Sequence, residues 1–176
     1  MRYTYNFLLL SIFLILTTNL SQAEQLKIFY VDVDKIIIES NVGKKIEKDF
    51  RSIVEKKNKE FNKIEKNLKK KDGDLIKQKN ILSKDELNNK IKSLEKEIKD
   101  YRADKNKFNQ NISQKKLKAT SEMIVYLNRI LGKYASDNSA SLIIQKKNII
   151  IGKSEMDITK QIMEIFNKEV KSVKFN

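Results

Sequence analysis

The segment 44–134 limits the fold more than any other part of this sequence. It contains no proline, and nearly half of it is lysine, glutamate and asparagine. Its apolar residues are few and recur at helical spacing. A narrow apolar stripe with charged residues on all other sides predicts long helices that pack on one face only. The segment therefore predicts an extended helical arm rather than a globular core.

The two halves of this segment carry different apolar repeats. In the first half, Phe50 and Phe61 are eleven residues apart, and so are Ile53 and Ile64. An eleven-residue repeat keeps one stripe on a nearly straight helix. The second half has alternating steps of four and three residues, which is a heptad pattern. Its members are Leu87, Ile91, Leu94, Ile98, Tyr101, Phe108 and Ile112, with Lys105 as the one gap.

A break near residue 80 predicts that the two halves fold back on each other. Ser83 and Glu86 have the spacing of a capping box, which begins a helix. The apolar positions mirror each other about Ser83, as an antiparallel hairpin with its tip near 80–84 requires. Each helix would be about 50 Å long. Gly73 is either a hinge or a point where the first helix flexes, and the phase of Leu75 favours a continuous helix.

Residues 24–43 and 135–176 predict a small body that is split in sequence by the arm. The runs 27–33, 142–144 and 149–151 are β-type, and the last two predict a hairpin. Residues 36–38 fit either a helical turn or more strand. Asp157 or Thr159 can cap a final helix with an apolar face of Ile158, Ile162, Ile165 and Phe166. The expected fold class is α+β: a small oligomeric β-body with a long helical-hairpin arm, 44–134, inserted in it.

The predicted body is too small to be stable alone. It has about sixty residues, and domains of that size are marginal without disulfides, metals or oligomerisation. The sequence has no cysteine or histidine, so disulfides are excluded and metal ligands are scarce. We therefore infer oligomerisation through the sheet.

Residues 1–23 have the pattern of a cleaved signal peptide. Arg2 is followed by an apolar run over residues 7–16, and small residues stand at 21 and 23. The alternative is a transmembrane anchor, but the run is well short of the ~20 residues that span a bilayer. The expectation is export of a mature chain that begins near residue 24.

The composition argues against an enzyme. Without histidine or cysteine there is no imidazole acid or base and no thiol nucleophile. Gly43-Lys44 lacks the upstream glycine of a phosphate-binding loop, and Lys45 stands where such a loop has serine or threonine. No cofactor and no metal site are expected.

The order of these motifs resembles the Skp/OmpH family of bacterial periplasmic chaperones. A signal peptide precedes the strand 28–33, then Ser40-x-x-Gly43-Lys44, a charged hairpin with Leu82-Ser83-x-x-Glu86 at its tip, the 142–151 strands and an Asp157-Ile158-Thr159 helix start. The resemblance implies a homotrimer in the periplasm whose arms surround a cavity. It implies that unfolded outer-membrane proteins are held there without ATP. The family is also linked to lipopolysaccharide, so the resemblance implies anionic lipid or lipopolysaccharide as a further partner. We assign no residues of this chain to such a binding site.

Two roles remain open for the aromatic residues of the arm. They either contact an unfolded client or only join the two helices, as heptad positions usually do. The lysines that interrupt the stripe would steer an acidic client. The candidates are Phe50, Phe61, Tyr101 and Phe108 with Lys57, Lys71 and Lys105, and the hinge and tip residues are Gly73, Ser83 and Glu86.

Two other functions compete with the chaperone hypothesis. A net charge of +14 is typical of nucleic-acid-binding proteins, but an exported chain meets no nucleic acid and its aromatics do not cluster as a base-stacking surface. A structural coiled-coil protein of the cell envelope should form long rods rather than a hairpin that turns at Ser83. The sequence therefore favours the chaperone.

Overall fold

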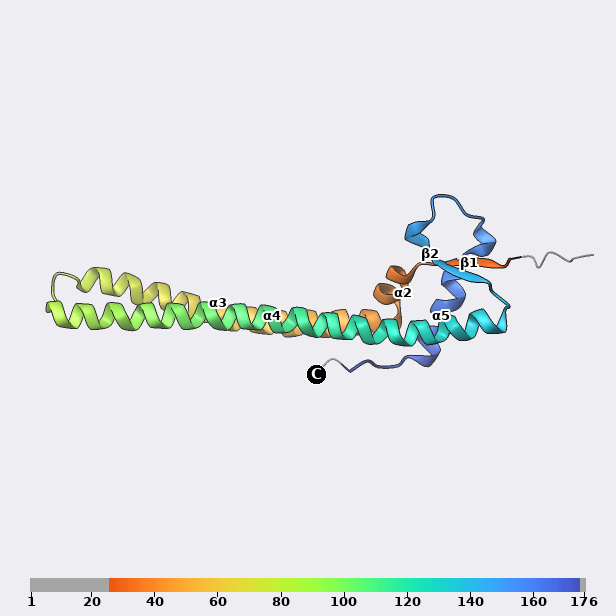
Figure 1. The fold of residues 1–176 in the computed structure, drawn as a ribbon. Helices are drawn as coiled ribbons and strands as arrows, with labels where there is room; N and C mark the ends of the chain where they lie inside the picture. The colour runs from red at the N-terminus through yellow and green to blue at the C-terminus, as the bar shows by residue number, and fades with distance from the viewer. Residues whose placement is uncertain (1–25, 175–176) are drawn as a thin grey trace, which may run out of the picture.

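The computed structural model describes residues 26–174 and shows a small body with one long arm (Figure 1). The proposed signal segment 1–23 lies outside the described residues. Most of the chain is helical, and the body contains a two-stranded sheet. The expected α+β class with an inserted helical arm is confirmed.

The arm is an antiparallel pair of helices, α3 (Asn41–Gln78) and α4 (Lys84–Asp137). At 1.5 Å per residue, the 38 residues of α3 extend about 57 Å. The helix is continuous through Gly73, as the phase of Leu75 predicts. The turn between the helices follows Gln78 and ends at Ser83. The helical hairpin of the expected fold is confirmed.

A sharp corner joins the body to the arm. Helix α2 (Val33–Glu39) contains residues 36–38, which are therefore helical and not strand. Ser40 is fully buried, and its side chain accepts a hydrogen bond from the Gly43 N–H at 3.1 Å. This bond caps the start of α3. The buried serine thus ends one helix and begins the next.

The sheet pairs two strands that lie on either side of the arm in sequence. β1 (Ile28–Val31) runs parallel to β2 (Leu142–Gln145), with Ile28 opposite Leu142. Parallel strands need a long crossover connection. Here α2 and the entire arm form that crossover, so the chain leaves the body after β1 and returns to it before β2.

The predicted hairpin between 142–144 and 149–151 is wrong. β2 is followed by a short 3₁₀ turn, η1 (Lys146–Asn148), and residues 149–151 form no strand. The backbone of β2 pairs with that of β1 instead. Ile150 and Ile151 are 99% and 91% exposed, since no strand or helix covers them in the single chain.

The core lies where the body meets the base of the arm. Helix α5 (Thr159–Glu169) follows a second 3₁₀ turn, η2 (Ser154–Met156), and contributes the apolar face that the sequence predicts. The residue before α5 is Ile158, so neither predicted cap occupies that position, although the Asp157 Oδ1 accepts a hydrogen bond from the Thr159 N–H. The buried residues of this core include Val31, Ile36, Phe50, Met123, Leu127, Ile130, Ile158, Ile162 and Phe166.

Candidate functional site

The aromatic candidates lie in the seam between the two arm helices. Phe50 and Phe61 are 1% and 3% exposed. The Phe61 ring makes edge-to-face contacts with Tyr101 and Phe108, with ring centroids 5.9 and 5.8 Å apart. Such pairs add about 0.5–1.5 kcal/mol beyond burial. In this structure the aromatics join α3 to α4, and Phe50 and Phe61 present almost no surface to solvent.

The three candidate lysines lie along the edges of this seam. Lys57 Nζ is 2.8 Å from Glu60 and 5.2 Å from the centre of the Phe61 ring. Its hydrogen bond and charge lower the pKa of Glu60 below its usual value. Lys105 Nζ lies 5.7 Å from the Tyr101 ring centre. Each ammonium group stays close to water while it lies within cation–π distance of an aromatic face.

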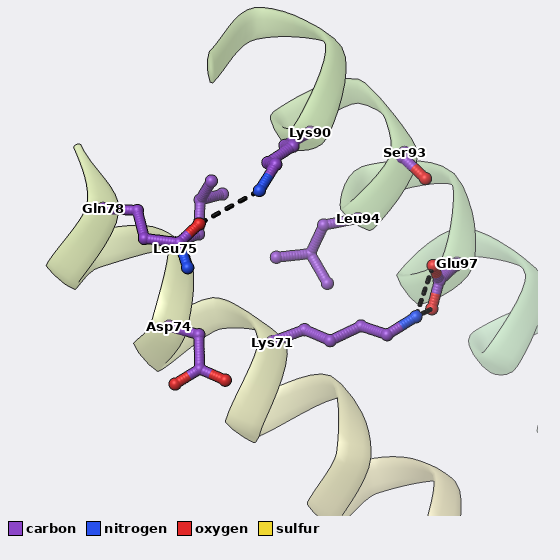
Figure 2. Close-up of a pocket in the computed structure, with 8 residues that line it drawn as sticks. All are labelled: Lys71, Asp74, Leu75, Gln78, Lys90, Ser93, Leu94 and Glu97. Atoms are coloured by element: carbon purple, nitrogen blue, oxygen red, sulfur yellow. Dashed lines mark hydrogen bonds and ion pairs between the residues drawn. The ribbon is translucent and has the colours of Figure 1, made fainter. Parts of the chain in front are cut away.

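Lys71 has a different partner, because it reaches across to α4. Its Nζ contacts both carboxylate oxygens of Glu97 at 2.7 Å (Figure 2). Nearer the tip, Lys90 Nζ donates to Gln78 Oε1 at 3.0 Å. These two polar bridges connect the helices where the seam has few apolar residues. Both are exposed, and exposed pairs stabilise by roughly 0–1 kcal/mol.

A groove of about 270 Å³ opens between the helices beside these bridges. Figure 2 shows Leu94 projecting from α4 toward α3, with Leu75 opposite. Such a volume is below the usual range for small-molecule sites, and it suits a single side chain. The residues that line the groove are Lys71, Asp74, Leu75, Gln78, Lys90, Ser93, Leu94 and Glu97.

The tip is closed by the predicted capping box. Ser83 Oγ accepts from the Glu86 N–H, and Glu86 Oε2 accepts from the Ser83 N–H at 3.1 Å. The hydrogen bonds from Ser83 lower the pKa of Glu86 below its usual value. Gly73 lies in the last third of α3, and a Cβ added there would meet no atom within 4 Å. The helix therefore does not need glycine at this position for packing.

The arm carries most of the positive charge of the molecule. Residues 41–137 contain 27 lysines and arginines against 15 acidic residues, a net charge of +12 out of the +14 of the whole sequence. A long rod of this charge creates a field that attracts anionic groups along its length. The number of lysines follows from the sequence, whereas the structure shows that most of them lie on the projecting arm.

Several exposed apolar side chains were not singled out as site residues from the sequence. Ile53 and Ile64 are 42% and 43% exposed on α3, and near the tip Ile76 and Ile81 are 68% and 83% exposed. The eleven-residue repeat placed Ile53 and Ile64 in the stripe with Phe50 and Phe61. It did not show that the isoleucines lie about 60° around the helix from the phenylalanines, outside the seam.

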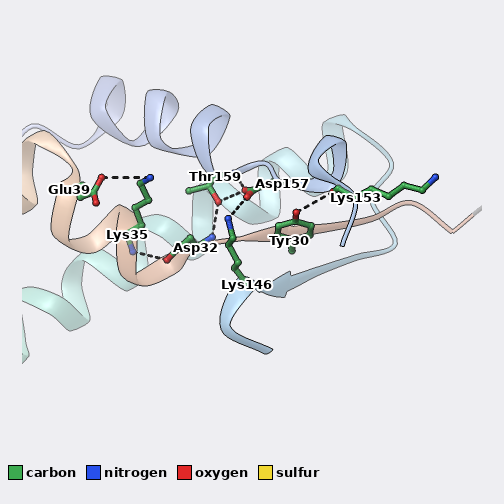
Figure 3. A network of polar contacts seen from close by, with 8 residues as sticks. All are labelled: Tyr30, Asp32, Lys35, Glu39, Lys146, Lys153, Asp157 and Thr159. Carbon is green, nitrogen blue, oxygen red and sulfur yellow. Dashed lines mark hydrogen bonds and ion pairs between the residues drawn. The ribbon is translucent and has the colours of Figure 1, made fainter. Parts of the chain in front are cut away.

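A polar network in the body was also missed. Tyr30 Oη donates to the Lys153 carbonyl at 3.2 Å, and Lys146 Nζ contacts Asp157 at 2.7 Å (Figure 3). Thr159 Oγ1 accepts from the Asp32 N–H at 2.9 Å. The Lys146–Asp157 contact joins the two ends of the segment 146–157 to each other, and the Tyr30 hydrogen bond joins Lys153 to β1. The loop that carries Ile150 and Ile151 is thus anchored at its base.

Two kinds of site are missing from the described residues. Within 26–174, no group of three or more acidic, histidine or cysteine side chains could hold a metal ion. In the same part of the chain, none of the helices combines the length and the hydropathy of a bilayer-spanning segment.

The comparisons with known proteins agree with this architecture. Residues 27–166 match the family model described as outer membrane protein (OmpH-like). No curated protein sequence matches the chain. The fold is similar to the crystal structure of a Caulobacter crescentus CB15 protein described as an OmpH-like outer membrane chaperone, with a TM-score of 0.78 and 16% identity over 86% of this chain and 89% of that one. Because the family match spans the strand, the arm and the last helix, the chain belongs to the OmpH-like family.

Proposed function

We propose that this protein is an ATP-independent holdase chaperone, not an enzyme, that binds unfolded outer-membrane proteins in the periplasm. The observation that carries the proposal is the arm of an OmpH-like chain, about 57 Å long with a net charge of +12. An exposed arm of this kind can hold a flexible chain along its length.

Passive holding needs many weak contacts rather than one tight site. Positive charge speeds the encounter with an acidic chain and makes the rate sensitive to salt. Several arms in one assembly raise the effective concentration of the second and third contacts. Binding of this kind is strong in sum while each contact stays reversible. The same charge would attract anionic lipid or lipopolysaccharide, for which we assign no residues.

The single chain also supports assembly into the homotrimer that the family resemblance implies. Two strands alone make a marginal sheet, and the strand edges offer unpaired backbone groups. Ile150 and Ile151 are almost fully exposed beside this sheet, and Leu142 in β2 is 51% exposed. A second and third copy would cover these side chains. The proposed cleavage after residue 23 would deliver the mature chain to the periplasm for this assembly.

The test is an aggregation assay with the mature protein. A urea-unfolded outer-membrane β-barrel is diluted into buffer with and without an equimolar amount of trimer, and light scattering is followed at low salt. Suppressed scattering without any nucleotide is the expected result. A folded, acidic soluble protein in place of the trimer is the control for non-specific crowding. Unchanged scattering with the trimer present would rule out the holdase function.

A further inference from the structure

One side of the arm carries a straight row of residues that the seam leaves uncovered. Ile53, Ile64, Lys71 and Gln78 on α3 are separated by eleven, seven and seven residues. At 100° per residue, each step changes the direction by only about 20°, so all four point the same way. The two isoleucines are over 40% exposed although α3 is packed against α4. This row therefore lies beside the seam rather than in it.

The row leads directly into the groove near the tip. Lys71 and Gln78 line that groove on the α3 side, and Lys90 and Glu97 line it on the α4 side (Figure 2). Leu94 forms part of the apolar lining and is 8% exposed. The bonds of Lys71 and Lys90 to α4 and α3 cross the groove at the surface. A recess with Leu75 and Leu94 in its lining, and with both ammonium and carboxylate groups around them, thus continues the line of the two isoleucines.

We propose that this side of the arm, defined by Ile53, Ile64 and the tip groove and called here the lateral track, is the surface that contacts the client. The inference rests on the proposed holdase function and assigns its contact residues. The track takes an unfolded polypeptide of net negative charge. Its apolar side chains meet Ile53 and Ile64 and enter the tip groove, while its carboxylates lie near Lys71 and Lys90.

The spacing of the track favours an extended chain over other occupants. Ile53 and Ile64 are about 16 Å apart along the helix, which about five residues of extended chain can span. Apolar points separated in this way, with Glu60 between them, do not form the continuous patch of a rigid protein interface. The net charge of +12 on the arm complements an acidic chain and opposes a second, equally basic arm on the same surface.

Crosslinking from single cysteines can locate the client on the arm. The chain has no cysteine, so Ile64→Cys and Lys66→Cys each provide one attachment point for a photoreactive group. These positions are at nearly the same height on α3 but about 200° apart around it. A urea-unfolded β-barrel should crosslink at least about threefold more strongly from position 64. Equal yields, or a higher yield from position 66, would overturn the proposal.

Affinity measurements test whether the track stabilises the complex. Ile53→Gln combined with Ile64→Gln removes the apolar contacts, and glutamine is as good a helix former as isoleucine or better. The matched control is Ile76→Gln, since Ile76 is also exposed but points about 120° away from Ile64. The double variant should bind the unfolded β-barrel at least about fivefold more weakly, while the control binds as the wild type does. Equal affinities of all three proteins would contradict the lateral track.

Two measurements separate failure of the track from other causes. If wild-type protein does not suppress aggregation, the holdase function itself fails, whatever the variants do. If wild-type protein holds the client but the Ile53/Ile64 double variant dissociates into monomers, the row is an interface between copies and the track assignment is wrong. Mass measurement of the variant at the assay concentration decides this point, and circular dichroism confirms that its helices are intact.

Discussion

Gly43 fixes the angle at which the arm leaves the body. It follows the buried Ser40 at the corner between α2 and α3, and its N–H is bonded to the Ser40 side chain. A Cβ at this position would overlap the backbone carbonyl of Ile37. The backbones of the two helices therefore approach as closely as only glycine permits.

Substitution of Gly43 by alanine should destabilise the body by about 1–3 kcal/mol, because the backbone of α2 must move to admit the methyl group. Urea unfolding followed by circular dichroism measures this loss. Gly132→Ala is the matched control, since a Cβ there meets no atom within 4 Å and the variant should be as stable as the wild type or more so. An equal loss in both variants would show that close approach at Gly43 is not the cause.

Asp157 makes the stability of the body depend on pH. Burial by itself raises its pKa, but the hydrogen bonds from Lys146 and Thr159 and the charge of Lys146 hold the pKa below its usual value of 3.8. A carboxylate whose folded pKa is lowered stabilises the fold above its unfolded pKa. That stabilisation is lost as the pH falls through the folded pKa.

Acid should therefore release the loop that Asp157 anchors. In Asp157→Asn the free energy of unfolding should be lower at neutral pH and should fall less steeply below about pH 4 than in the wild type. Urea unfolding at a series of pH values measures both effects. Asp100→Asn, which removes one exposed charge of the arm, is the control. Parallel curves for the wild type and Asp157→Asn would mean that the Lys146–Asp157 contact does not stabilise the body.

At the scale of elements, the arm is held together unevenly along its length. The aromatic cluster of Phe61, Tyr101 and Phe108 packs its middle. Beyond it, exposed polar bridges and the tip groove take the place of a continuous apolar seam. Gly73 lies in this weaker part and lowers the helix propensity of α3 there. Local opening should therefore begin at the tip and spread toward the aromatic cluster.

Gly73→Ala should stabilise the outer part of α3, since the added Cβ meets nothing and alanine favours helix by about 1 kcal/mol over glycine. Amide hydrogen exchange should become slower in residues 69–78 and stay unchanged in the body. The wild type measured under the same conditions is the reference. Faster exchange in the variant would indicate that glycine is needed for the native backbone at this point.

In the molecule as a whole, the strongest positive charge and the most exposed apolar pair lie on different parts. The arm carries +12, whereas the loop of the body presents Ile150 and Ile151 almost fully to solvent. The arms of neighbouring copies repel each other electrostatically, whereas contact between bodies would bury exposed apolar side chains. Both effects favour an assembly in which the copies meet through their bodies and the arms stay apart. This separation is the physical basis for the proposed trimer.

Ile150→Lys combined with Ile151→Lys should convert the proposed trimer into monomers, because it places charges in the contact between copies. Light scattering coupled to size exclusion measures the mass. The helical content should not change, since both side chains are exposed in the single chain. Ile76→Lys, which adds a charge near the tip, should leave the trimer intact. A wild-type monomer, or a trimeric double variant, would contradict assembly through this loop.

The arm could be predicted from residue order alone. Helical hydrogen bonds and caps are local, so the apolar repeats and the Ser83–Glu86 capping box were sufficient to predict two antiparallel helices and their turn. The charge of the arm and the apolar face of α5 were likewise readable from residue order. Which of the candidate residues bind a client stays a prediction, because it concerns a partner and not the fold.

Contacts between segments far apart in sequence became known only from the three-dimensional structure. The sequence placed residues 149–151 beside 142–144 because hairpins join neighbours, whereas β2 pairs with β1 across the whole arm. The sequence also did not show which of the two rows is buried, because Ile53 and Ile64 follow the same eleven-residue repeat as Phe50 and Phe61. Two helices in contact bury only a narrow seam between them. The larger phenylalanines are buried in that seam, and the isoleucines, about 60° away, are left at the surface.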